Sequence, residues 1–129
     1  MTTFLVWIGW YNVVGSVVLF ALLHPNMAHA LLHAWTRILS QPWSPGPLGR
    51  LWLSWAAACN LALGFLMVRA AAWPDAPQRD VVLATMGVYA VMYGVLLTGG
   101  RQPLFGPGLA VVHVLWLAQL GWGLWLLMA

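Results

Sequence analysis

Four long apolar runs, separated by prolines, constrain this chain more than any other feature of its sequence. A helix needs about 20 apolar residues to cross the hydrocarbon core of a bilayer, and each run approaches or meets that length. Proline breaks helices, so the prolines between the runs mark the connections. We predict a single all-α membrane domain, residues 1–129, whose four transmembrane helices form a bundle and cover 4–23, 51–70, 81–97 and 109–128.

The charge content agrees with this fold class and excludes several functions. Only 5% of the 129 residues are charged and 63% are hydrophobic, whereas about a quarter of a soluble domain is charged. We therefore expect the lipid bilayer to be the main partner, with no nucleic acid. The chain has no lysine for a Schiff base, and no acidic residue inside an apolar run to drive a proton antiporter.

Residues 26–40, between the first two runs, carry polar side chains at helical spacing. The apolar side chains of this stretch fall largely on the opposite face. A helix of this kind lies along the membrane surface, with its apolar face in lipid. We predict an amphipathic interfacial helix over 26–40, whose polar face is made of Asn26, His29, His33, Arg37 and Ser40.

Each apolar run contains one hydrogen-bonding side chain near its middle. A helical rise of roughly 1.5 Å per residue places these side chains about 12 to 15 Å from the same end of the bundle. Polar side chains at helix contacts can bond across the bundle and fix its register. The same layer could instead line a polar pocket for the headgroup of a ligand, a quinone carbonyl or a file of water. Its members are Asn12, Asn60, Tyr89 and Gln119, with Asn60 the expected partner of Asn12.

The four histidines offer weaker candidates for ligand binding. His29 and His33 have the spacing of a helical metal-binding pair, but a catalytic zinc site needs a further ligand and no carboxylate lies nearby. We expect no metal there. His24 and His113 are predicted at similar depth on antiparallel helices, where they could ligate a tetrapyrrole.

These observations favour a non-catalytic membrane protein, since no nucleophile and base or metal cluster is apparent. The first hypothesis is an accessory subunit that contacts other transmembrane subunits of a respiratory or photosynthetic complex. The alternatives are a module that binds a lipid, quinone or tetrapyrrole, although no cofactor is required, and a small channel or carrier.

The arginines predict the orientation of the chain. Four spans place both termini on one side of the membrane, together with Arg69 and Arg79. The other side carries Arg37, Arg50 and Arg101. By the positive-inside rule, this arginine-richer side faces the cytoplasm and the termini face the periplasm. The expected location is the bacterial inner membrane.

Overall fold

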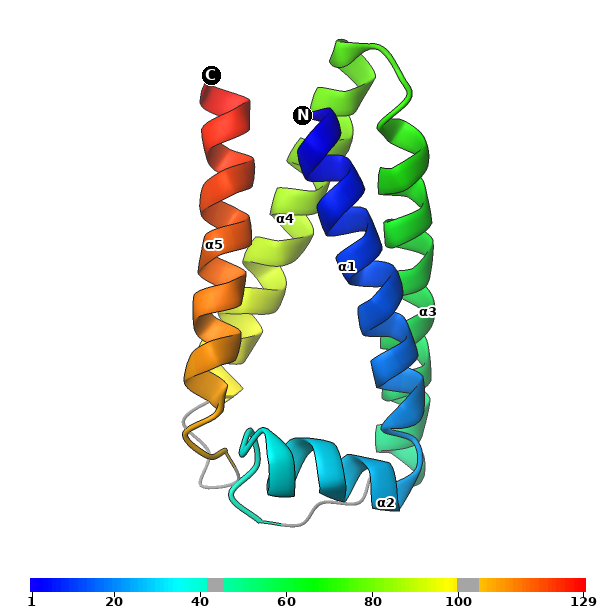
Figure 1. Ribbon diagram of the computed structural model, residues 1–129, viewed down its shortest axis with the longest axis vertical. Helices are drawn as coiled ribbons and strands as arrows, with labels where there is room; N and C mark the ends of the chain where they lie inside the picture. Colours follow the sequence, from blue (N-terminus) through cyan, green and yellow to red (C-terminus); the bar gives the residue numbers. More distant parts are fainter. Residues whose placement is uncertain (42–45, 100–104) are drawn as a thin grey trace.

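The computed structural model describes residues 1–41, 46–99 and 105–129, and nearly all of them are helical. Four long helices run lengthwise, and both chain termini lie at one end beside the turn between α3 and α4, here called the termini end (Figure 1). Two short helices lie crosswise over the opposite end, here called the η1 end. The elements are α1 (Thr2–Ala21), α2 (Pro25–Ala28), the π-helix η1 (His29–Trp35), α3 (Pro47–Ala70), α4 (Asp75–Gly99) and α5 (Leu109–Met128).

The long helices confirm the helical membrane character that composition predicts. In the described ranges, three helices are long and apolar enough to cross a membrane, namely α1, α3 and α5. Helix α4 is similar in length but is not among these three helices. The fourth crossing therefore stays a prediction. Arg101, used for the predicted orientation, lies outside the described residues.

Three long helices, α1, α3 and α4, begin earlier than their apolar runs, and the first turns of α3 and α4 have helix-starting residues. Helix α3 begins at Pro47, a residue whose fixed φ suits the first helical position. Helix α4 begins at Asp75, whose carboxylate interacts favourably with the positive end of the helix dipole. Hydropathy detects only the apolar part of each helix. Helix α5 has the predicted bounds.

The prediction of one helix over 26–40 is wrong beyond Trp35, where η1 ends. The Thr36 N–H and hydroxyl both donate to the Leu31 carbonyl, at 3.0 and 2.6 Å, and close the last turn. Arg37 then takes a φ of 53°, which a helix cannot continue. The amphipathic pattern continues to Ser40, but backbone bonds to the segment before α5 replace helical bonds beyond Thr36.

Helices α1 and α3 pack against each other along most of their length. Their backbones touch at two glycines: a Cβ added to Gly64 would lie 2.7 Å from the Gly9 carbonyl oxygen. In the other direction, a Cβ on Gly9 would lie 2.8 Å from a Val68 methyl group. Small residues allow this close approach of membrane helices. Helices α4 and α5 form the second pair.

The two helix pairs meet mainly toward the termini end and diverge toward the η1 end (Figure 1). The buried apolar core lies in the part where they meet. Its largest fully buried members come from α1, α3 and α4. The core cluster consists of Phe4, Leu5, Ile8, Met67, Ala70, Val82, Met86 and Tyr89.

A buried glutamine ties the termini end together, and sequence reasoning did not single it out. The Gln78 amide nitrogen lies 2.8 Å from the Trp73 carbonyl and 3.1 Å from the Ala71 carbonyl. It also lies 3.2 Å from the Thr2 hydroxyl. One side chain of α4 thus satisfies carbonyls just after α3 and contacts the start of α1.

The glycine contact yields a stability prediction. Gly64→Ala should lower the free energy of unfolding by about 1 to 3 kcal/mol, because the new methyl group would displace the α1 backbone. Gly121→Ala is the matched control, since nothing lies within 4 Å of its Cβ position. The measurement is unfolding in detergent followed by circular dichroism. Equal stability of the two variants would contradict the close helix contact.

Candidate ligand cavity

Two members of the predicted polar layer are joined directly. Asn12 of α1 is only 2% exposed, and its amide nitrogen donates to the Tyr89 hydroxyl of α4 at 2.6 Å. The same nitrogen donates to the Ile8 carbonyl at 2.7 Å. Because a carbonyl can only accept, this second bond fixes which end of the amide is nitrogen. Asn12 therefore pairs with Tyr89 and not with Asn60, the partner expected from depth.

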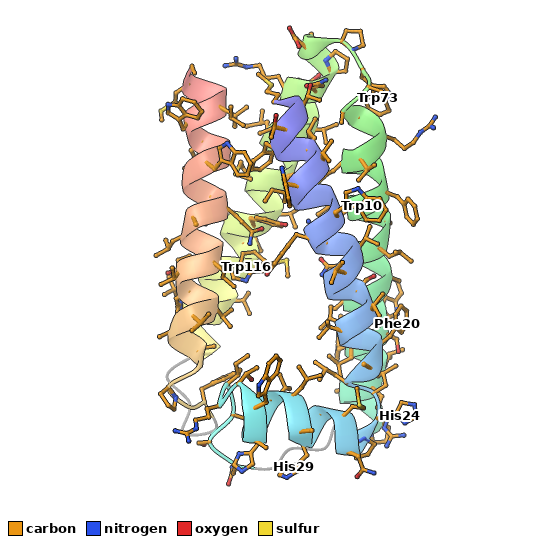
Figure 2. The ribbon with its side chains drawn as sticks, viewed as in Figure 1. Trp10, Phe20, His24, His29, Trp73 and Trp116 are labelled. Atoms are coloured by element: carbon orange, nitrogen blue, oxygen red, sulfur yellow. The ribbon has the colours of Figure 1, made fainter. Side chains whose placement is uncertain are left out.

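The direction of this bond leaves the Tyr89 hydroxyl with an unused proton. Its oxygen accepts from Asn12, so its O–H can donate to a third group. The Tyr89 ring is held in place by Trp116 of α5, with ring centroids 4.7 Å apart. Figure 2 shows Trp116 extending from α5 toward the space that faces α1. The hydroxyl is thus a positioned donor between the two helix pairs.

Beside this bond is a cavity of about 380 Å³ between the helix pairs. Its walls are mainly apolar and come from α1, α3, α4 and α5. Among the described residues that line it, none carries a charge. The lining residues are Tyr11, Asn12, Val14, Gly15, Val18, Leu19, Asn60, Tyr89, Met92 and Trp116.

Asn60 is the polar side chain of α3 that faces this cavity. It is half-buried, and its amide makes no hydrogen bond within the described part of the chain. A second hollow of about 290 Å³ shares Asn60, Leu19 and Met92 with the first and also contacts Cys59. Asn60 therefore lies between two adjoining hollows, where its amide could bond to a ligand.

Gln119, the fourth predicted member, lies apart from the cavity lining. It is 7% exposed, and its side-chain oxygen is buried without a hydrogen-bond partner in the described ranges. The predicted layer is therefore divided. Asn12 and Tyr89 form a pair, Asn60 faces an open cavity, and Gln119 is buried on α5.

The structure does not bring the proposed tetrapyrrole ligands together. His24 is exposed at the junction of α1 and α2, away from α5 in Figure 2. His113 of α5 is half-buried, and its ring packs edge-on against Tyr93 at 5.7 Å. The two candidate ligands therefore lie in different parts of the structure, His24 at the η1 end of α1 and His113 on α5.

The candidate metal pair is adjacent in space. The rings of His29 and His33 stack with centroids 5.1 Å apart, and Figure 2 shows His29 pointing away from the long helices. His33 Nδ1 lies 3.2 Å from the Leu39 carbonyl, so this nitrogen carries the proton. Within the described residues, no group of three potential metal-ligating His, Cys, Asp or Glu side chains occurs.

Among the residues of the cavity wall that sequence reasoning missed are Gly15 and Trp116. Gly15 lies beside Asn60, whose amide nitrogen would be in ordinary van der Waals contact, at 3.5 Å, with a Cβ at that position. Trp116 covers Tyr89. Both have a signal in the sequence, since Gly15 follows Asn12 by three residues and Trp116 precedes Gln119 by three. Residues at this spacing share a helix face.

A double-mutant cycle should measure the Asn12–Tyr89 bond. Asn12→Ala and Tyr89→Phe are expected to couple by about 0.6 to 1.7 kcal/mol in the free energy of unfolding, as interhelical hydrogen bonds in membranes do. Tyr93→Phe is the control, because no hydrogen bond to that hydroxyl occurs in the described residues. Unfolding in detergent is the measurement, and a coupling as small as that of the control would contradict the bond.

Comparison with known proteins gives no family for the chain. No protein-family model, no curated protein and no solved structure matches it. A function for the cavity is therefore inferred from the residues that line it.

Proposed function

We propose that this chain is a four-span membrane protein that binds a neutral apolar molecule carrying a carbonyl group. The observation that supports this most is the cavity of about 380 Å³, in which Asn60 has no partner among the described residues. Ligand sites are typically apolar cavities with a few convergent polar groups. The role is binding without catalysis.

The Tyr89 hydroxyl suits a hydrogen-bond acceptor in the ligand. The Tyr89 hydroxyl has a free proton because its oxygen accepts from Asn12. The Asn60 amide supplies N–H donors from the opposite helix pair. A quinone presents carbonyl oxygens to such donors, and its isoprenoid tail suits walls made of Val14, Val18 and other apolar side chains.

The proposed membrane topology includes α4 as the fourth span. Its residues 81–97 contain no charged side chain, and it lies alongside α5. The charged first turns of α4 would then lie at the membrane surface together with both termini. We propose, from the arginine distribution, that this end faces the periplasm of a bacterial inner membrane.

Quinone binding can be tested through tryptophan fluorescence, because Trp116 lines the cavity. The purified protein in detergent is titrated with a ubiquinone analogue that has a decyl tail. Asn60→Leu removes the hydrogen bond but keeps a side chain of similar size, so the dissociation constant should rise about five- to tenfold. Saturable quenching is expected in the unmodified protein.

Ser54→Ala is the matched control on the same helix, because the exposed Ser54 hydroxyl donates to the Arg50 carbonyl of its own helix and to no other described residue. Its affinity should equal that of the unmodified protein. No saturable quenching in the unmodified protein, or equal affinity after Asn60→Leu, would refute the proposed site.

A second candidate function is that of an accessory subunit in a larger membrane complex. One observation favours it: the helix pairs diverge, and side chains at the rim of the cavity remain exposed, Val14 by 60%. A transmembrane helix of another subunit could cover this rim. The apolar surroundings of the cavity would suit such a contact as well as they suit lipid.

Cys59 allows the two candidates to be distinguished. It is exposed and is the single cysteine of the chain, so a photoreactive maleimide would label one position beside the cavity. Crosslinking in native membranes should give an adduct with one membrane protein in fixed ratio if the chain is a subunit. Adducts of lipid or quinone mass alone would count against the subunit hypothesis.

A further inference from the structure

A further pocket, separate from the ligand cavity and from the hollow beside Cys59, lies at the η1 end. Its volume is about 450 Å³, and it is formed where the chain leaves η1 and meets the segment that precedes α5. It is far more polar in character than the ligand cavity, since it contains a guanidinium and an imidazole. Its lining residues are His33, Ala34, Arg37, Leu39, Ser40 and Pro107.

Two backbone hydrogen bonds hold this pocket together. The Gly108 N–H donates to the Arg37 carbonyl at 3.0 Å, and the Gly106 N–H donates to the Ile38 carbonyl at 2.8 Å. Arg37 is the single described non-glycine residue with a positive φ, 53°. Such conformations persist where the surrounding structure imposes them, and they are concentrated at functional sites.

The two glycines are required by this close approach. A Cβ on Gly108 would lie 1.9 Å from the Thr36 carbonyl oxygen, and one on Gly106 would lie 2.4 Å from the Arg37 carbonyl oxygen. No side chain fits at either position. The chain therefore places glycines on both sides of Pro107, and the pocket wall that faces Arg37 is built from tightly packed backbone.

Arg37 has no counter-charge within the chain. The two acidic residues are Asp75 and Asp80, and both lie in the first turns of α4 at the opposite, termini end. In the ranges that the structure describes, the Arg37 guanidinium makes no ion pair or hydrogen bond. Arg37 is exposed, so its guanidinium is accessible to an anion from outside the chain.

His33 presents a second polar group to the same pocket. Its Nδ1–H donates to the Leu39 carbonyl at 3.2 Å, which fixes the ring. The remaining nitrogen, Nε2, can donate to an anion in the imidazolium form of the ring, in which both nitrogens are donors. An arginine with a fixed backbone and an oriented imidazole is suited to the tetrahedral oxygens of a phosphate group, which arginine can bind with two parallel hydrogen bonds.

We propose that this pocket binds the phosphate group of an anionic phospholipid. The crosswise helices α2 and η1 join two membrane-spanning helices, which places them at the level of the lipid headgroups (Figure 1). Basic residues at this level attract anionic lipids. The lipid would link η1 to the start of α5 and so stabilise the η1 end, where the helix pairs diverge.

Native mass spectrometry of the full chain with phosphatidylglycerol and with phosphatidylcholine tests the proposal. The unmodified protein should retain phosphatidylglycerol preferentially. Arg37→Gly removes the charge but suits a positive φ, because glycine adopts this conformation without strain. It should keep or raise the thermal midpoint while lowering the retention of phosphatidylglycerol about tenfold, the size expected for charge-assisted hydrogen bonds.

Arg50→Gln is the matched control, because Arg50 is exposed in the first turn of α3 at the same end but does not line the pocket. Its retention of phosphatidylglycerol should fall less than twofold. Equal losses of phosphatidylglycerol retention in the two variants would indicate a diffuse surface attraction instead of a specific pocket. That result would overturn the proposal. Stabilisation of the unmodified protein by inorganic phosphate alone, with no preference for phosphatidylglycerol, would assign the pocket to a soluble phosphate compound instead.

Discussion

The contact of two backbones at Gly9 and Gly64 is the constraint on which the rest of the structure depends. It brings α1 and α3 so close that they form one unit along most of their length. The second unit, α4 with α5, then meets the first through larger side chains such as Tyr89 and Met86. Beyond these large side chains, space is left between the pair α1 and α3 and the pair α4 and α5. The cavity lies in that space.

The polar side chains near the middle of the helices have two different roles in this arrangement. The Asn12 amide nitrogen is shared between the Ile8 carbonyl and the Tyr89 hydroxyl. Asn60 lies on the face of α3 beside Gly15 and the cavity, and its amide makes no hydrogen bond within the described residues. The Asn12–Tyr89 bond therefore fixes the register of the bundle and also orients the Tyr89 hydroxyl. The contact between the helix pairs and the proposed ligand site thus share this one hydrogen bond.

The sequence was sufficient to predict the helical membrane fold and the crosswise segment after α1, because hydropathy and helical periodicity act over many residues. It also identified Asn12, Asn60 and Tyr89, since polar side chains inside apolar runs are rare. It could not predict which of them pair, because pairing depends on the rotation of each helix about its axis. Depth alone favoured Asn60 for Asn12, whereas the structure pairs Asn12 with Tyr89. The end of η1 could not be predicted either, because it depends on backbone hydrogen bonds from Gly106 and Gly108, which lie far along the chain.

Helices α2 and η1 cross one end of the bundle, and the buried core fills the other. A molecule in the cavity would then enter sideways, between the diverging helix pairs, from the hydrocarbon phase. Its binding would depend on its mole fraction in the lipid and not on its concentration in water. Occupancy would then follow the composition of the membrane, and the protein would respond to dilution by added lipid more than to dilution by buffer. For such a site, the bilayer acts as both solvent and reservoir.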